Sequence, residues 1–250
     1  MPSSRARANR GSCHSQGVCA SAYKIASPEI VDLPLIRYTA NQGKPLIMST
    51  GMATLAEIEE AVAAAREGGD GGVLLLHCTA AYPTPPEESN LATITDLARR
   101  MGVAVGLSDH TLDTTVATIA VALGACAIEK HVTLSRADGG VDSAFSLEPD
   151  ELARLVRDVS VAQAAVGVPT YAPTRSEANV LRNRRSLYVV APVRDGEVLT
   201  PDSVRSIRPA NGLSPKHLDR VLGRRAARDL SYGEPLSWSM VEGGDPGAPS

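Results

Sequence analysis

Five repeats of one pattern, a short apolar run followed by an amphipathic stretch, span residues 22–167. The apolar runs predict strands, and the longer stretches predict helices because their apolar residues recur with helical spacing. Strands that alternate with helices form a parallel sheet with helical crossovers, so the region is predicted to be an α/β fold. We expect strands at 22–26, 45–49, 72–77, 103–107 and 125–131, and helices at 30–40, 55–68, 90–101, 114–123 and 149–166.

The segments on either side of this region differ from it in composition. Residues 168–183 contain two prolines and little periodicity, which predicts a linker. From 184 to 245, short strand-like runs (187–191, 204–208, 225–229 and 236–238) predict a small β domain. Gly196-Glu197 recurs as Gly233-Glu234, which indicates two similar halves unless the match is a coincidence. Residues 1–21, rich in Ser, Arg and Gly, are predicted to be disordered, and 246–250 form a tail.

Composition excludes several classes of protein. The net charge is −3 and no basic stripe is present, so no nucleic-acid partner is expected. No apolar run reaches the roughly 18 residues of a membrane span, and no signal peptide precedes the fold, so we expect a cytoplasmic protein. Cys13, His14 and Cys19 fit no standard metal spacing. Cys78 and Cys126 lie in apolar runs and are predicted to be small buried residues.

Two histidines stand at the ends of the last two predicted strands. His110 closely follows the run 103–107, and His131 ends the run 125–131. If these strands are neighbours in a parallel barrel, both imidazoles emerge at the C-terminal rim, where barrel enzymes keep their chemistry. Neighbouring strands lie about 4.8 Å apart, so the two imidazoles could bind one ion. Imidazole is a common ligand of divalent metals. The pair therefore predicts a metal site, with a structural role for each histidine as the alternative.

Lysines and hydroxyl groups are predicted at the same rim. Such groups, together with backbone N–H groups, bind phosphorylated anions, although a single rim serine is more often a helix cap. Glu29 is either a general acid or base, or a first-turn carboxylate favoured by the helix dipole. Glu129 is predicted to pair with a lysine or arginine. The rim groups are Lys24, Lys130, Ser27, Ser49, Thr50 and Ser108.

Segments of the chain resemble, in order, the successive motifs of the sialic acid synthase family. They are YKIASPE (23–29), STGM (49–52), LHCTAAYPTP (76–85), GLSDHT (106–111) and EKH (129–131). The C-terminal part, with RPANG (208–212), resembles the antifreeze-like (SAF) domain that ends those enzymes. The run ADGGVDSAFSL (137–147) is most similar to the pseudaminic acid synthases, with N-acetylneuraminate and legionaminate synthases as alternatives.

The resemblance implies a (β/α) barrel of TIM type followed by a β-clip SAF domain. It implies condensation of phosphoenolpyruvate with a 2,4-diacetamido-2,4,6-trideoxy hexose to give a nonulosonic acid and phosphate, for cell-surface glycans. A divalent ion, Mn²⁺ or Mg²⁺, on His110 and His131 would act as a Lewis acid on the sugar aldehyde. Lys24, Ser27, Ser49 and Ser108 would bind phosphoenolpyruvate. Glu29, Tyr82 and Asp142 would face the sugar or handle protons, and Arg208 would come from the partner of a domain-swapped homodimer.

The chain departs from this family in length. TIM barrels have eight strands, and the five predicted here match the fourth to eighth, while residues 2–21 match nothing in the first three units. We therefore expect the 250-residue chain alone to be inactive or to fold poorly. Two other functions stay open: a Schiff-base aldolase that uses Lys24 or Lys130 as nucleophile, and a non-catalytic carbohydrate-binding remnant.

Overall fold

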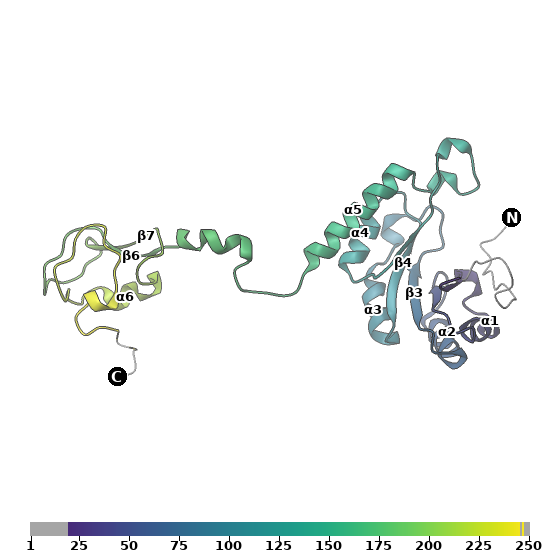
Figure 1. The fold of residues 1–250 in the computed structure, drawn as a ribbon, viewed down its shortest axis with the longest axis horizontal. Helices are drawn as coiled ribbons and strands as arrows, with labels where there is room; N and C mark the ends of the chain where they lie inside the picture. Colours follow the sequence, from purple (N-terminus) through teal and green to yellow (C-terminus); the bar gives the residue numbers. More distant parts are fainter. Residues whose placement is uncertain (1–19, 246, 248–250) are drawn as a thin grey trace. The chain divides into compact units, whose positions relative to one another are not determined.

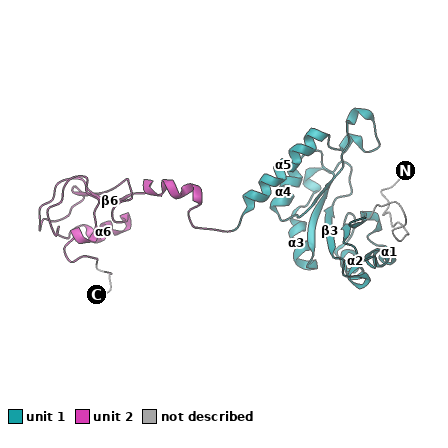
Figure 2. Ribbon diagram, viewed as in Figure 1, with its two compact units in different colours: residues 1–168 teal, residues 169–250 magenta. Residues whose placement is uncertain are grey.

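The computed structural model describes residues 20–245 and 247, which belong to two compact units. The first unit ends at Val168 and the second begins at Pro169 (Figure 2). The predicted disordered start and the set Cys13, His14 and Cys19 lie outside the described residues, as does most of the predicted tail. None of the helices in the described part is long and apolar enough to span a membrane.

A five-stranded parallel sheet forms the centre of the first unit (Figure 1). The strands lie side by side in sequence order, so β1 and β5 are its outer strands among the described residues. This arrangement is half of a TIM-type barrel and confirms the predicted fold class. Its strands are β1 (Tyr23–Ile25), β2 (Leu46–Ser49), β3 (Val73–Cys78), β4 (Ala104–Asp109) and β5 (Ile128–Lys130).

Five helices follow the strands, and two of them have the predicted bounds. They are α1 (Leu33–Ala40), α2 (Leu55–Gly68), α3 (Ala92–Met101), α4 (Thr115–Ala122) and α5 (Pro149–Val166). Helix α2 begins at Thr54, whose hydroxyl accepts from the Glu57 amide while the Glu57 carboxylate accepts from the Thr54 amide. Helix α1 begins three residues later than predicted because Ser27–Glu29 forms a separate 3-10 turn and Asp32 caps the helix.

The strand register decides which side chains share a face of the sheet. Cys78 pairs with Ser108, and Ser108 pairs with Glu129, so these three side chains lie on one face. Lys24 and Ser49 belong to the same face, because Lys24 pairs with Ile47, two residues before Ser49. Alternate residues such as Ile25, Met48, Leu75 and Leu107 are buried in the apolar core against the helices. The polar groups thus gather on the open face.

A predicted buried cysteine proves to be exposed. Cys126 lies just before β5, in a groove of about 640 Å³ between β5 and α5 that Ile128 and Leu155 also line. The prediction that Cys126 is buried is therefore wrong. An apolar run predicts that a segment joins the sheet, but it does not show whether other elements cover each residue. Cys126 is left uncovered because it borders an open groove.

The second unit is a small fold with one regular two-stranded antiparallel sheet, β6 (Ser186–Val189) and β7 (Val204–Ile207). Its core contains Leu187, Leu199 and Leu236. Arg225 and Ala226 make only isolated bridges, and Trp238–Met240 forms a 3-10 turn. The predicted strands at 225–229 and 236–238 are therefore wrong, because these turn-rich runs pair for one residue at a time. The remaining helix is α6 (Leu218–Val221).

The predicted repeat in this unit has a structural counterpart. The Glu197 carboxylate accepts from the Arg194 amide at 2.9 Å, and the Glu234 carboxylate accepts from the Ser231 amide at 2.8 Å. Both turns continue through a glycine with positive φ at 196 and 233. The segment predicted as a linker is not wholly irregular, because Arg175–Asn183 forms a 3-10 helix that a Thr174–Glu177 capping box begins.

Candidate active site

A cavity of about 500 Å³ opens at the C-terminal ends of the strands, on the open face of the sheet. We call it the rim cavity. Seven of the predicted site residues line it, which confirms that the strand ends bring them together. Its lining residues are Lys24, Ala26, Ser27, Pro28, Ser49, Met52, Cys78, Ala80, Tyr82, Ser108, His110, Glu129, Lys130 and His131.

The two histidines lie next to each other, with ring centroids 5.3 Å apart. The Nδ1 atom of His110 is 3.0 Å from the Thr79 carbonyl oxygen. A carbonyl oxygen only accepts, so Nδ1 carries the proton and the Nε2 lone pair is free for a ligand. His131 has Nδ1 3.8 Å from an Asp142 carboxylate oxygen. Burial lowers the pKa of His110, so this imidazole is in the neutral form that binds metal.

Lys24, Ser108 and Glu129 form one hydrogen-bonded group on the floor of the rim cavity. The Lys24 ammonium donates to both carboxylate oxygens of Glu129, at 2.8 and 2.9 Å, and the Ser108 hydroxyl donates to one of them at 2.7 Å. Burial alone would raise the pKa of the Glu129 carboxyl, but the bonds from Lys24 and Ser108 outweigh burial and lower it. The predicted pairing of Glu129 with a lysine is confirmed.

Ser27 and Ser49 complete the floor of the cavity, and both are buried. The Ser27 hydroxyl accepts from the Gly51 amide at 3.0 Å. A Cβ at Gly51 would lie 2.8 Å from that hydroxyl oxygen, so only glycine fits at this position without displacing Ser27. The Ser49 hydroxyl oxygen is buried and has no hydrogen-bond partner within the described part of the chain. An unpaired buried hydroxyl is costly unless a ligand or water satisfies it.

The predicted sugar-facing residues occupy different positions. Tyr82 covers the histidines, with its ring centroid 4.2 Å from that of His110, and burial raises the pKa of its hydroxyl. Asp142 is exposed beside His131. Glu29 lies in the turn after β1, and its Oε2 atom is buried without a partner among the described residues. Arg208 is exposed and follows β7 in the second unit.

The ammonium group of Lys130, a predicted candidate nucleophile, is bonded to structural partners. Its ammonium group donates to Asp109 at 2.7 Å and to the Thr111 carbonyl oxygen, with only 3% of the side chain exposed. A lysine held in this way is not presented to a substrate carbonyl. The role of Lys130 as a Schiff-base nucleophile is therefore disfavoured.

Three residues of the site were not assigned a site role from the sequence. Phe145 contacts His131 and Tyr82, with ring centroids 5.2 and 5.4 Å away, and it is the only phenylalanine of the chain. Cys78 lies with Sγ 3.9 Å from the Nδ1 atom of His110. Glu129 was expected to be structural. The alternation along β3 and β5 contains the signal for Cys78 and Glu129, because it places them on the face of Lys24 and Ser108.

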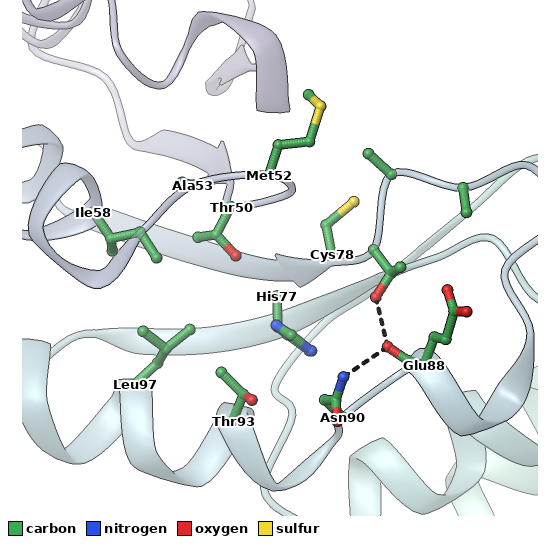
Figure 3. Close-up of a pocket in the computed structure, with 13 residues that line it drawn as sticks. Thr50, Met52, Ala53, Ile58, His77, Cys78, Glu88, Asn90, Thr93 and Leu97 are labelled. Carbon is green, nitrogen blue, oxygen red and sulfur yellow. Dashed lines mark hydrogen bonds between the residues drawn. The ribbon is translucent and has the colours of Figure 1, made fainter.

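A second cavity, of about 650 Å³, lies between α2 and α3 (Figure 3). Its polar groups already bond to one another: Thr79 and Asn90 both donate to the Glu88 carbonyl oxygen at 3.0 Å. His77 bonds through Nε2 to the Ser89 carbonyl oxygen at 2.8 Å. Burial lowers the pKa of His77, so the cavity offers a charged substrate no counter-charge from this side chain. The rim cavity is the better candidate.

Comparisons with known proteins place the chain in a family. The model of the NeuB family matches residues 15–171, and that of the SAF domain matches 184–242. Pseudaminic acid synthase from Campylobacter jejuni is 39% identical over 87% of this chain and 64% of its own length. N,N'-diacetyllegionaminic acid synthase from Campylobacter jejuni is 39% identical over 85% of this chain and 64% of its own.

A solved structure extends the likeness to three dimensions. It is that of a putative spore coat polysaccharide biosynthesis protein E from Chromobacterium violaceum. Its sequence is 30% identical and its TM-score is 0.67, over 89% of this chain and 68% of that one. The chain thus spans less than two thirds of the two Campylobacter relatives but carries both of the matched domains. It belongs to the NeuB family.

Proposed function

We propose that the rim cavity is the site of a nonulosonic acid synthase reaction, in which phosphoenolpyruvate condenses with an amino sugar aldehyde. The observation that carries the proposal is the neighbouring pair His110 and His131, 5.3 Å apart between ring centroids, above a floor with a lysine and three serines. Two imidazoles suit a divalent ion, and the floor suits a phosphorylated anion.

Orphaned polar atoms support the anion subsite. The Ser49 hydroxyl is buried and has no partner among the described residues, while the backbone amide of Gly51 lies beside Ser27. Lys24 supplies the positive charge. In this proposal Lys24, Ser27, Ser49 and Ser108 hold the phosphate and carboxylate of phosphoenolpyruvate. The unpaired Oε2 of Glu29 serves as the acceptor or proton carrier for the sugar.

The donor set at the rim fits a divalent ion. No third His, Cys, Asp or Glu joins His110 and His131 to form a metal-binding group within the described residues, so water and substrate oxygens would complete the coordination. Mn²⁺ or Mg²⁺ bound there would polarise the aldehyde oxygen of the sugar. The protein's own contribution is to hold His110 in its neutral tautomer through Thr79 and to cover the histidines with Tyr82.

We infer a 2,4-diacetamido-2,4,6-trideoxy hexose, the pseudaminate precursor, as the sugar. The support is the run 137–147, in which Asp142 lies beside His131 and Phe145 packs on it. Legionaminate synthesis is the alternative, because relatives of both names share 39% identity with the chain. The role of Arg208, the domain-swapped homodimer and the cytoplasmic location are predictions that accompany this proposal.

The function is tested with the chain and with a fusion. The fusion joins residues 20–245 to the part of the Campylobacter jejuni pseudaminic acid synthase that the chain does not match, which we expect to carry the first three strand–helix units of the barrel. We expect the fusion, with Mn²⁺, to consume phosphoenolpyruvate and the trideoxy sugar and to release phosphate, and chelation to stop it. The chain alone should bind the ion but turn over slowly. N-acetylmannosamine should be a poor substrate.

Two results would contradict the proposal. One is a folded, Mn²⁺-binding fusion that consumes no phosphoenolpyruvate with either sugar. The other is a borohydride-trapped adduct of pyruvate on Lys24 with metal-independent activity, which would indicate a Schiff-base aldolase. A His110→Ala fusion serves as the inactive reference, and His217→Ala, in the second unit, serves as the matched control.

A further inference from the structure

The carboxylate of Glu129 accepts hydrogen bonds from Lys24 and Ser108, two of the residues that the proposed function assigns to phosphoenolpyruvate. Both of its oxygens accept from the Lys24 ammonium, and one also accepts from the Ser108 hydroxyl. A carboxylate and a phosphate present similar oxygens to a lysine and a serine. A side chain with the chemistry of the ligand therefore already bonds to both of these groups.

The exposure of this ion pair shows that it can be exchanged. The side chains of Lys24 and Glu129 are 33% and 45% exposed, within a cavity open to solvent. The pair Asp109–Lys130, which joins β4 and β5, is only 1% and 3% exposed. Solvent-exposed pairs contribute about 0–1 kcal/mol, so an incoming anion can break the first pair but not the second.

Charge repulsion prevents Glu129 and a bound anion from pairing with Lys24 at the same time. The Glu129 carboxylate is held as the anionic partner of the Lys24 ammonium, with Nζ and Oε2 2.8 Å apart. An anion bound to Lys24 beside that charge would be repelled, and Ser108 has one hydroxyl proton to donate. One of the two anions must leave.

We propose that Glu129 is an internal competitor for the anion subsite: it pairs with Lys24 and Ser108 when the site is empty and is displaced when the phosphorylated substrate binds. The pairing keeps the two groups satisfied and oriented between turnovers. Its cost is a weaker affinity for the anion. This inference rests on the anion subsite of the proposed function.

The test is the affinity for inorganic phosphate, measured by titration calorimetry in the absence of sugar. Glu129→Gln removes the charge, and Glu129→Asp keeps the charge on a side chain too short to hold Lys24 and Ser108 together. We expect both variants to bind phosphate about fivefold more tightly than the wild type. Glu67→Gln is the control: it removes an exposed ion pair, Arg37 Nε to Glu67 Oε2 at 2.9 Å, that does not line the cavity. This variant should leave the phosphate affinity unchanged.

Each other outcome overturns the inference. Tighter binding by Glu129→Gln alone would mean that simple charge repulsion, not occupation of Lys24 and Ser108, limits binding. Weaker or unchanged binding by both variants would make Glu129 a support for Lys24 rather than a competitor. A phosphate-bound crystal structure of the wild type gives a second readout, in which the Glu129 carboxylate should lie more than about 4 Å from the Lys24 ammonium.

The two proposals fail separately. Turnover by the fusion with unchanged phosphate affinity in both Glu129 variants would reject the competitor and keep the synthase. Tighter phosphate binding in both variants, without turnover by the fusion, would keep the competitor and reject the synthase.

Discussion

At the residue scale, the two faces of the sheet give opposite roles to the charged side chains of the strands. Glu129 and Lys130 are neighbours in β5, but the Glu129 carboxylate pairs with Lys24 in the rim cavity, whereas the Lys130 ammonium is buried against Asp109. Their partners follow the same alternation: Lys24 and Ser108 for the first, and Asp109 for the second. A residue of the candidate site, Glu129, and a residue that supports the fold, Lys130, are thus adjacent in the sequence.

The buried ion pair should matter for stability more than the exposed one. We expect Lys130→Met to lower the free energy of unfolding by about 3–5 kcal/mol, because it leaves the Asp109 carboxylate buried and unpaired. Lys24→Met should change it by less than about 1 kcal/mol. Urea unfolding followed by far-ultraviolet circular dichroism measures both, since the only tryptophan lies in the second unit. Equal losses would refute the assignment.

His77 should make the stability depend on pH. Burial lowers the pKa of His77 in the folded chain below the ordinary histidine value of 6.5, so the unfolded chain takes up the proton first as the pH falls. The stabilisation is therefore present above about pH 6.5 and is lost as the pH falls below that value. His77→Gln, which can still donate to the Ser89 carbonyl oxygen, should flatten this part of the profile. A profile as steep as that of the wild type would count against His77, with His217→Gln as the control.

At the element scale, the helices that carry their own signals were predictable and those that depend on contacts were not. The capping box at Thr54 and the stop at Gly68 define α2, and α5 likewise has its predicted bounds. The outer strands β1 and β5 are shorter than the predicted runs 22–26 and 125–131, because pairing with a neighbour ends before the run does. The isolated bridges at Arg225 and Ala226 depend on distant partners, which no local pattern reveals.

The cap of α2 gives a prediction at this scale. Thr54→Ala should lower the stability of the first unit by about 1 kcal/mol, because the Glu57 amide loses its acceptor. Thr174→Ala removes the equivalent cap from the 3-10 helix 175–183, which has no buried residues. That variant should leave the urea midpoint of the first unit unchanged. A midpoint that Thr54→Ala does not move would show that packing alone holds α2.

At the scale of the whole molecule, the chain is two folded units, each with its own apolar core. The strand-end positions of the histidines, serines and Lys24 could be predicted because parallel strands align their C-terminal ends. The order Lys24–Glu129–Ser108 and the ring contacts of Phe145 could not, since they depend on the register between β4 and β5 and on the loop after β5. Arg208 lies in the second unit, so its part in the site stays a prediction.

The division into units predicts where proteases cut. Residues 168–174 are exposed and lie outside any helix or strand, so brief trypsin or elastase treatment should cleave there or at the nearest basic residue. The C-terminal fragment should show the same Trp238 fluorescence as the intact chain, and the unfolding midpoint followed by that fluorescence should be the same in both. Degradation of the fragment as fast as it appears would mean that the second unit does not fold by itself.

The central claim is that His110 and His131 form a metal site above an anion subsite. Mn²⁺ titration followed by electron paramagnetic resonance tests it directly, with His110→Ala, His131→Ala and the control His217→Ala. The account predicts one bound ion per chain in the wild type and the control, and at least about a tenfold loss of affinity in each of the other two variants. Mn²⁺ binding that is unchanged in both His110→Ala and His131→Ala would contradict it.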